Sequence, residues 1–391
     1  MPSPAHRIDN VQPPATIVAG DRARTLALQG RDMIDLSQSS PYHVTPSHIV
    51  EAGMAALRAG LTNISSPRGE LKFRRAMARK LESYNDLQVD FDNILVTPGS
   101  KQGLYYSMNG YIGEGDEVLL PEPTWVSFKQ QVELSQGTPV SVPLSEEEEY
   151  CLTYDALQQR VTPATKALVI NNPNNPTGRV YSVQELQAAA KIATEHDLLV
   201  ICDETYEYFV YGSERHVTLA SLPGMWDRTL TSYTFTKAYA MSGWRLGCIV
   251  GPQDLLEPLR KVHEHTASFV SPFVQAAGTA ALDGPQDHIE EWRLDCESLR
   301  TVVAARLNDV TGLTCAVPQG ATFVFPRYSA NHSSAELSMS MIEKAGVVVT
   351  PGSGFGDCGE GHFRIALMRS PSDRVLEGTD RICGFFESLQ G

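Results

Sequence analysis

The sequence predicts an α/β protein with two domains: a large domain with a mainly parallel sheet covered by helices, and a smaller α+β domain. Between residues 46 and 280, strand-like apolar runs alternate with helical patterns, as in parallel α/β sheets. Several of these runs are apolar at every position, which is typical of strands buried on both faces. After residue 281 the pattern changes to short strands and fewer helices. A chain of 391 residues is long enough for this second domain.

The large domain is expected to span residues 46–280 and to contain six strands. Helical patterns lie between most of them, for example at residues 182–195. Because strands and helices alternate, we expect right-handed crossovers that place the strands side by side. The candidate strands are residues 93–98, 116–121, 166–172, 198–204, 229–235 and 246–251.

The small domain is expected to combine residues 1–45 with residues 281–391. The first 45 residues form an arm rich in Pro and Ser, with one short helical pattern at 21–29. A long helical stretch at 286–307 leads into three strand-like runs, with one helix between the first two runs and another at the end. The three runs are residues 322–328, 346–352 and 362–369.

Composition excludes several classes of function. The net charge of −14 argues against nucleic acid or an anionic membrane as the main partner. No apolar run approaches the roughly 18–20 residues of a membrane span, and the first residues lack the apolar core of a signal peptide. The seven cysteines show no CxxC pattern, and Cys202 and Cys248 lie in apolar runs, as reduced core residues do. The acidic residues 146–149 are expected to form a solvated loop, not a metal site. We therefore expect a cytoplasmic protein without a metal.

Polar residues follow the predicted strands, where ligands of parallel α/β sheets bind. Residues 99–103 (GSKQG) precede a helical pattern, and a helix start of this kind can hold a phosphate, although many helix starts look alike. Residues 173–178 (PNNPTG) form either a simple turn or a site where the Asn175 amide meets a ligand. The bond between Asn175 and Pro176 is a candidate cis peptide.

Two further strand ends carry charged residues. Asp203 ends an apolar strand, so its carboxylate either pairs with a cation, with Tyr206 nearby, or caps a helix. Lys237 follows the next strand, and Arg245 comes eight residues later. A guanidinium can hold a phosphate bidentately, and its charge lowers the pKa of a nearby amine, which becomes nucleophilic.

One ligand, pyridoxal phosphate, accounts for all four strand ends. Its aldehyde takes a lysine as a Schiff base, and its pyridinium nitrogen needs an anion. Its phenolic oxygen needs hydrogen-bond donors, and its phosphate needs a cradle. The sequence therefore predicts pyridoxal 5'-phosphate as the cofactor.

At this point seven motifs make the chain resemble the class I aminotransferases, which have the type I fold of pyridoxal phosphate enzymes. The resemblance covers residues 11–386 and is greatest to the bacterial aspartate and aromatic aminotransferase subgroup. The motifs are, in order, VTPGSKQGL, PEPTWVSF, NNPNNPTGRVYS, CDETYEYF, TFTKAYAMSGWRLG, PGSGFG and FRIAL.

The resemblance implies a role for each cofactor-binding residue. Lys237 would be the Schiff-base lysine and the proton shuttle, and Asp203 would pair with the pyridinium nitrogen. Tyr206 and Asn175 would bond the phenolic oxygen. Trp125 would stack on the ring, the alternative being a core tryptophan. The residues expected around the phosphate are Ser100, Lys101, Gln102, Thr234 and Arg245.

The resemblance also implies the substrate contacts. Arg364 would bind the α-carboxylate, with Asn175 and Ser39 also lining the substrate site. Lys101 resembles a lysine near the distal carboxylate in the aspartate-specific subgroup, which favours a dicarboxylic amino acid as one partner. Members of the family are homodimers with active sites at the subunit interface.

Two positions depart from the family pattern. Ile64, in NISSPRG, stands where the family has a tyrosine that reaches the phosphate in the partner subunit. Ser39, in SSPYH, stands where the family has the glycine of GEPDF. These departures leave the substrate side chain open.

The leading interpretation is transamination. The amino acid would displace Lys237 from its aldimine with the cofactor, and the freed lysine would remove the α proton. Lys237 would then reprotonate the quinonoid, and hydrolysis would give a 2-oxo acid and pyridoxamine phosphate. The alternative is another pyridoxal phosphate reaction on the same scaffold: β- or γ-elimination, cyclisation or oxidation of an amino acid. A regulator on this fold would need a DNA-binding domain, and the first 45 residues carry no helix-turn-helix pattern.

Overall fold

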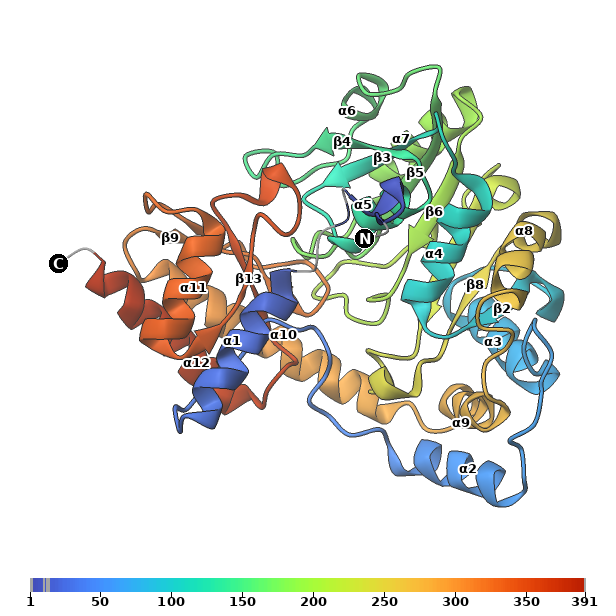
Figure 1. Ribbon diagram of the computed structural model, residues 1–391, viewed down its shortest axis with the longest axis horizontal. Coiled ribbons are helices and arrows are strands. Elements are labelled where there is room, and N and C mark those ends of the chain that lie inside the picture. The colour runs from blue at the N-terminus through green and yellow to red at the C-terminus, as the bar shows by residue number, and fades with distance from the viewer. Residues whose placement is uncertain (1–2, 10, 12–14, 390–391) are drawn as a thin grey trace.

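The computed structural model describes residues 3–9, 11 and 15–389, and Figure 1 shows their arrangement. Residues 1–2, 10 and 12–14 of the predicted N-terminal arm lie outside the described residues. A seven-stranded sheet has the order β2-β8-β7-β6-β5-β3-β4. Its strands are β2 (Ile94–Thr97), β3 (Glu117–Glu122), β4 (Thr138–Pro143), β5 (Thr165–Asn171), β6 (Leu199–Asp203), β7 (Thr229–Thr234) and β8 (Gly247–Val250).

The sheet is mainly parallel, as predicted. The pairs β3–β4, β3–β5, β5–β6 and β6–β7 are parallel, and β8 runs antiparallel to both β2 and β7. All six predicted strands are present. The sequence analysis missed β4, an edge strand with a proline at its second and its last residue and with only one fully buried position. Proline is tolerated at a sheet edge, so this strand lacks the apolar signal of the others.

Helices cover both faces of this sheet (Figure 1). Neighbouring residues of one strand belong to different apolar clusters: Leu119 packs on one side and Leu120 on the other, and Val200 and Ile201 divide in the same way. The predicted helix at 182–195 is α7, capped by a reciprocal pair of bonds between Ser182 and Glu185. The helices are α2 (Ser47–Arg58), α3 (Leu71–Tyr84), α4 (Ser100–Tyr111), α5 (Ser127–Leu134), α6 (Tyr154–Gln158), α7 (Val183–Glu195), α8 (Gln253–Glu264) and α9 (Pro272–Asp283).

The remaining elements gather beside the large sheet, at the left of Figure 1, and α10 (Asp287–Asn308) runs across to them. The predicted helices at 286–307 and near the chain end are present, but each of the first two predicted strands is divided in two. Pro326 lies between β10 and β11, and a proline cannot donate to a central ladder. These elements are β9 (Leu313–Thr314), β10 (Phe323–Val324), β11 (Arg327–Tyr328), α11 (Ser334–Ala345), β12 (Val347–Val348), β13 (Thr350–Pro351), β14 (Phe363–Ala366) and α12 (Ser372–Ser388).

Elements of the described part of the N-terminal arm contact this second group. Helix α1 (Ala15–Leu28) begins before the predicted 21–29 and lies beside α11 in Figure 1. Strand β1 (Ile34–Asp35) pairs in parallel with β12, so that Ile34 lies opposite Val347. The small sheets are β10-β14-β13, β11-β9 and β1-β12. Short 3₁₀ helices occur at His6–Ile8, Phe91–Asn93, Leu219–Ser221, Trp226–Arg228, Ser242–Trp244 and Asp357–Gly359.

Three compositional predictions can be checked in the fold. Cys202 and Cys248 are buried and unpaired, as predicted. The acidic residues 146–149 lie in a turn and three of them are exposed, but Glu146 is half-buried and faces Arg327 and His362. Among the described residues, no helix combines the length and apolar character that a membrane crossing requires.

Candidate active site

The carboxyl ends of β5, β6 and β7 bring the predicted polar residues to one edge of the sheet. Asn171 of β5 lies opposite Asp203 of β6, which in turn lies opposite Ser232 of β7. The segments that leave these three strands therefore begin next to one another. They carry the sequence PNNPTG, Tyr206 and Lys237.

Lys237 is a buried lysine, 8% exposed, in the turn after β7. Its Nζ atom donates to the Ser39 carbonyl oxygen at 2.8 Å and lies 2.9 Å from the Ser39 hydroxyl. Burial, followed by the positive charge of Arg364, lowers the pKa of this amine to about 7. About half of the Lys237 amine is thus neutral and nucleophilic at pH 7, a far larger share than in a surface lysine.

Asp203 ends β6 and is 5% exposed. Its Oδ1 atom accepts hydrogen bonds from the Thr205 backbone nitrogen at 3.2 Å and from the Thr205 hydroxyl at 2.6 Å. Burial raises the pKa of this carboxyl to about 6, against the opposing effect of the Thr205 bonds. The alternative of a helix N-cap is wrong, because residues 205–208 form a turn that no helix continues.

Tyr206 lies between Lys237 and the small sheets. Its ring contacts Phe323 edge-on at 5.1 Å between centroids, and the Lys237 Nζ atom lies 5.5 Å from the Tyr206 ring centre. The Tyr206 side chain is buried. The phenol and the amine therefore share one closed environment.

An anion cradle forms where α4 begins. Gly99 precedes the helix at φ 85°, and a Cβ there would lie 2.6 Å from the Arg245 Nη2 atom. Gly247 permits the close approach of β8, since a Cβ at that position would lie 2.6 Å from the Ser100 nitrogen. Arg245 donates to the carbonyls of Ser242 and Pro98, and no carboxylate of the described residues pairs with it. Free N–H groups of a helix start beside an unpaired guanidinium suit a phosphate.

The other residues predicted for the phosphate lie at the end of β7 and in the first turn of α4. Thr234 ends β7, and its hydroxyl lies 3.0 Å from the Thr236 hydroxyl. Lys101 is exposed on the first turn of α4, with its Nζ atom 4.8 Å from the ring centre of the half-buried Trp125. Gln102 follows in the same turn and is half-buried. A cavity of about 710 Å³ opens beside Arg245, between residues 43–45 and 269–274.

Arg364 of β14 is a buried cation that pairs with none of the carboxylates in the described part of the chain. Its guanidinium donates to Asn175 Oδ1 at 2.7 Å and to the Ser37 carbonyl at 2.5 Å, and its Nε atom has no partner. Burial lowers the pKa of this group to about 10. Because none of the described carboxylates neutralises it, the guanidinium suits an anionic ligand next to Lys237. The peptide bond between Asn175 and Pro176 is cis, as predicted.

Comparison with known proteins identifies the family. A family model described as aminotransferase class I and II matches residues 31–382. The chain belongs to this family. The aromatic-amino-acid aminotransferase 2 of Thermococcus litoralis is 40% identical over 354 residues, which cover 90% of each protein. A probable aspartate/prephenate aminotransferase of Aquifex aeolicus is 36% identical, covering 98% of this chain and 99% of that protein. The solved aspartate aminotransferase of Rhizobium meliloti has a TM-score of 0.93 at 31% identity, covering 99% of both chains.

The protein is therefore an aminotransferase of the type I fold that uses pyridoxal 5'-phosphate, as the sequence predicted. The residues present fit that cofactor. The unpaired Arg245 at the start of α4 suits a phosphate, and the buried Asp203 carboxylate suits a cationic ring nitrogen. The buried amine of Lys237 suits an aldehyde.

Two partners in this aminotransferase site were missed by the sequence analysis. Thr205 fixes the Asp203 carboxylate, and the local signal was available, because an Asp side chain often bonds the backbone two residues on. Ser37 offers its backbone carbonyl to Arg364 from 327 positions away. A backbone carbonyl leaves no trace in the sequence.

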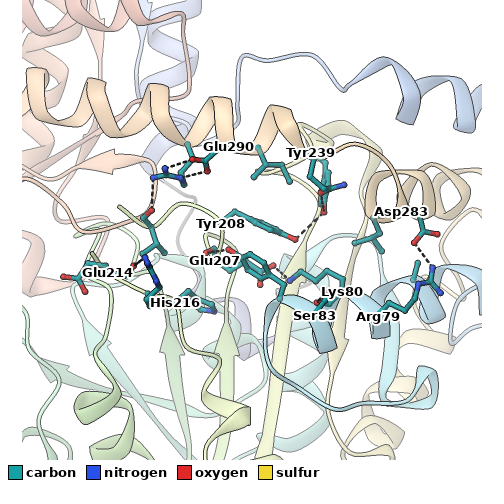
Figure 2. Close-up of a pocket in the computed structure, with 18 of the residues that line it drawn as sticks. Arg79, Lys80, Ser83, Glu207, Tyr208, Glu214, His216, Tyr239, Asp283 and Glu290 are labelled. Atoms are coloured by element: carbon teal, nitrogen blue, oxygen red, sulfur yellow. Dashed lines mark hydrogen bonds and ion pairs between the residues drawn. The ribbon is translucent and has the colours of Figure 1, made fainter. Parts of the chain in front are cut away.

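A second polar cluster lies outside the strand-end site, beside a cavity of about 780 Å³ that Glu207 and His216 line (Figure 2). Glu204, Glu207 and His216 each place one possible metal-ligand atom within 4.8 Å of the others. The Lys80 ammonium lies 2.5 Å from Glu207, and Asn85 donates to the same carboxylate at 2.7 Å. Glu207 is thus neutralised within the chain, and this cluster ties α3 to the connection between β6 and β7.

The lowered pKa of Lys237 leads to a pH prediction for the cofactor-free protein. Only the neutral amine reacts with a small acylating reagent. Acylation of Lys237 is therefore expected to reach half its maximal rate near pH 7, rather than near the ordinary lysine value of 10.5. Peptide mass spectrometry over pH 5–11 measures this, with the exposed Lys191 as the internal reference. A Lys237 midpoint as high as that of Lys191 would contradict the buried environment.

Proposed function

We propose that this aminotransferase moves the amino group of an L-amino acid to a 2-oxo acid, with a dicarboxylic amino acid as one of its partners. The observation that carries this proposal is Arg364, a buried guanidinium without a carboxylate partner among the described residues, held beside Lys237. An α-carboxylate bound there would neutralise the cation and bring the α-carbon toward the lysine amine.

Each predicted residue has a proposed task. The bound cofactor supplies an electron sink for the substrate's α-carbon. Lys237, whose lowered pKa of about 7 leaves a large neutral fraction at that pH, takes the proton from that carbon and returns it. Asp203, held by Thr205, keeps a negative charge beneath the ring nitrogen. Asn175 orients Arg364 through its side-chain oxygen.

The remaining proposed tasks concern the phosphate, the ring and the phenolic oxygen. Tyr206, buried beside Lys237, donates to that oxygen, and Trp125 covers one face of the ring. The phosphate contacts proposed are Ser100, Lys101, Gln102, Thr234 and Arg245. The start of α4 and the unpaired guanidinium support this set.

The dicarboxylic preference rests on Lys101. Its side chain is exposed on the first turn of α4 and lies over Trp125, where a distal carboxylate of a bound substrate could reach it. The names of two relatives, an aspartate/prephenate and an aromatic-amino-acid aminotransferase, agree with a site that takes a dicarboxylic and a larger substrate in turn. No feature of the site favours the alternative of elimination, cyclisation or oxidation.

Replacing Arg364 and Lys101 separately tests the proposed division of labour. Arg364→Ala is expected to reduce kcat/KM for every amino acid alike, because all share the α-carboxylate, by roughly 30-fold to 5,000-fold for a lost buried ion pair. Lys101→Ala is expected to reduce it more for aspartate and glutamate than for monocarboxylic amino acids, because the distal carboxylate contact is lost in addition to a phosphate contact that all substrates share. The measurement is kcat/KM over a panel of amino acids.

Arg369→Ala provides the matched control, since Arg369 is a half-buried arginine of the same region whose guanidinium pairs with Asp35. Its effect should be small. If Arg364→Ala and Lys101→Ala changed the panel in the same proportions, the assignment of one carboxylate to each cation would be wrong.

We also propose that the protein is a homodimer. Support comes from exposed apolar side chains on α2 and on the segment that leads to α3. A stripe of this kind suits burial against a second copy. Ile64 is the most exposed of these side chains, at 87%, and Ser65, beside it, donates to Glu70 of the same chain at 2.6 Å. The stripe comprises Met54, Leu57, Leu61, Ile64 and Leu71.

The domain division and the compartment are proposals as well. The division into residues 46–280 and residues 1–45 with 281–391 is supported by the apolar clusters: one is formed mostly by residues of the second set, joined by Phe209, Tyr211 and Ala240, and others lie on the large sheet. A cytoplasmic location for this amino acid metabolism is supported by seven free cysteines, which a reducing compartment maintains.

A further inference from the structure

Residues 36–46, which form a strap between β1 and α2, bring Ser39 into contact with the amine of Lys237. The Lys237 Nζ atom lies 2.8 Å from the Ser39 carbonyl oxygen and 2.9 Å from the Ser39 Oγ atom. The strap is anchored two residues earlier, where the Ser37 carbonyl accepts from Arg364 at 2.5 Å and from the Thr350 hydroxyl at 2.8 Å. The contacts of Ser37 therefore help to hold Ser39 in position, in addition to the bonds between Ser39 and Lys237.

The Ser39 hydroxyl also reaches the phenol of Tyr206. Burial raises the pKa of that phenol, and a hydrogen bond with the Ser39 side chain acts in the opposite direction. A hydroxyl accepts one hydrogen bond and donates another at the same time. Ser39 can thus accept from the Lys237 amine while it donates to the Tyr206 oxygen.

The side chain of Ser39 is a feature of this chain, because the class I pattern has glycine at the corresponding place in GEPDF. A glycine offers the amine only its carbonyl. Here the amine has a carbonyl and a hydroxyl on the same residue, which together fix two of its N–H directions. The direction of the nitrogen lone pair is then fixed by the protein when the amine is free of the cofactor.

We propose that the Ser39 hydroxyl is a positioning residue for the free amine of Lys237: it accepts a hydrogen bond from the amine, donates one to Tyr206, and so directs the nitrogen lone pair toward the substrate's α-carbon. The proposal rests on the proton-transfer role proposed above for Lys237. It assigns Ser39 to the step in which the lysine is free, and not to substrate affinity.

The proposal gives two measurable effects of Ser39→Ala. An acceptor oxygen stabilises the protonated amine, so its loss should lower the midpoint of Lys237 acylation in the cofactor-free protein by about half a pH unit to one unit. In the loaded enzyme, kcat should fall by about 3-fold to 10-fold while KM for the amino acid stays within about 2-fold.

Three further variants make the comparison specific. Ser39→Gly should behave like Ser39→Ala, and Ser39→Thr, which keeps a hydroxyl, should restore both the midpoint and kcat. Ser40→Ala is the matched control, since Ser40 is the next residue of the strap and is also half-buried. Ser40→Ala should leave both quantities unchanged. Thermal unfolding of each variant shows whether the strap remains folded.

The outcomes separate this proposal from the proposed function. An acylation midpoint in Ser39→Ala equal to that of Ser40→Ala, or a rise in KM with kcat unchanged, would overturn the role of Ser39. If the wild type transferred no amino group but the midpoint still moved, the proposed function would fail and the contact between Ser39 and Lys237 would stand. If Ser39→Ala did not fold, the comparison of Ser39→Thr with Ser39→Gly would take its place. The midpoint of Lys237 acylation should be higher in Ser39→Thr, which keeps a hydroxyl, and equal midpoints would overturn the role of Ser39.

Discussion

Lys237→Ala is expected to reduce amino-group transfer by roughly 10⁴-fold, the upper range for loss of a positioned acid–base group. The reason is the position of this amine, 8% exposed, with a pKa of about 7, between Asp203 and Arg364. Within the described residues, no other lysine has its pKa lowered so far by burial. The measurement is 2-oxo acid released per active site, under single-turnover and steady-state conditions.

Two controls accompany this variant. Lys166→Ala removes an exposed lysine that pairs with Asp116, and it should retain full activity. Thermal unfolding of Lys237→Ala should match the wild type within a few degrees, because removing a buried amine also removes its desolvation cost. Transfer at more than a tenth of the wild-type rate by Lys237→Ala would refute the assignment.

Asp203→Asn is expected to slow removal of the α proton by roughly 10²-fold to 10³-fold, as the loss of one preorganised electrostatic group does. The substitution keeps an oxygen that can accept from Thr205, whose two bonds to Oδ1 are 3.2 Å and 2.6 Å long. It removes only the negative charge, which the wild type carries above its pKa of about 6. Exchange of the amino acid's α-hydrogen with deuterated water measures this step alone.

The exchange rate is also expected to change with pH in a defined direction. Because burial raises the pKa of Asp203 to about 6, the wild-type carboxylate is lost as the pH falls through 6, and the exchange rate should fall with it. Protonation of the Lys237 amine, whose pKa is about 7, lowers the exchange rate of both enzymes below that pH. The asparagine variant should keep this dependence and lack the additional fall near pH 6. Asp197→Asn, at an exposed aspartate paired with Arg228, is the matched control. Exchange within a few-fold of the wild type in Asp203→Asn would show that the charge does not act on the reaction.

The sequence predicted six of the seven strands of the large sheet, because the apolar runs that indicate these strands are local features of the sequence. The runs that became β5 and β6 are continuously apolar, so their strands and the polar residues that end them could be read directly. Asp203 was found in this way, since a charged residue that ends an apolar run must be partly buried. Lys237 was found because it follows the strand-like residues 229–235 and precedes Arg245. The strand β4, half-buried and rich in proline, gave no such signal.

The small sheets could be predicted only in outline. The runs at 322–328 and 346–352 have the composition of strands, but each is divided into two short strands that pair with different partners. The pairing of Ile34 with Val347 joins segments more than 300 positions apart, and no periodicity in either segment specifies it. Which short strands pair is decided by how the two ends of the chain pack together.

By itself, then, the sequence determined the chemistry: a lysine, a carboxylate and a helix start that each follow or end a strand, and a guanidinium, Arg245, just before β8. The tertiary structure alone decided their mutual arrangement. Asn175 and Arg364 meet across 189 positions, and Lys237 meets Ser39 across 198. The physical reason is that the residue type determines which bonds a side chain can make. The partner is determined by how the N-terminal arm packs over the sheet edge. In the case of Lys237 this packing supplies both the hydroxyl and the backbone carbonyl of a serine.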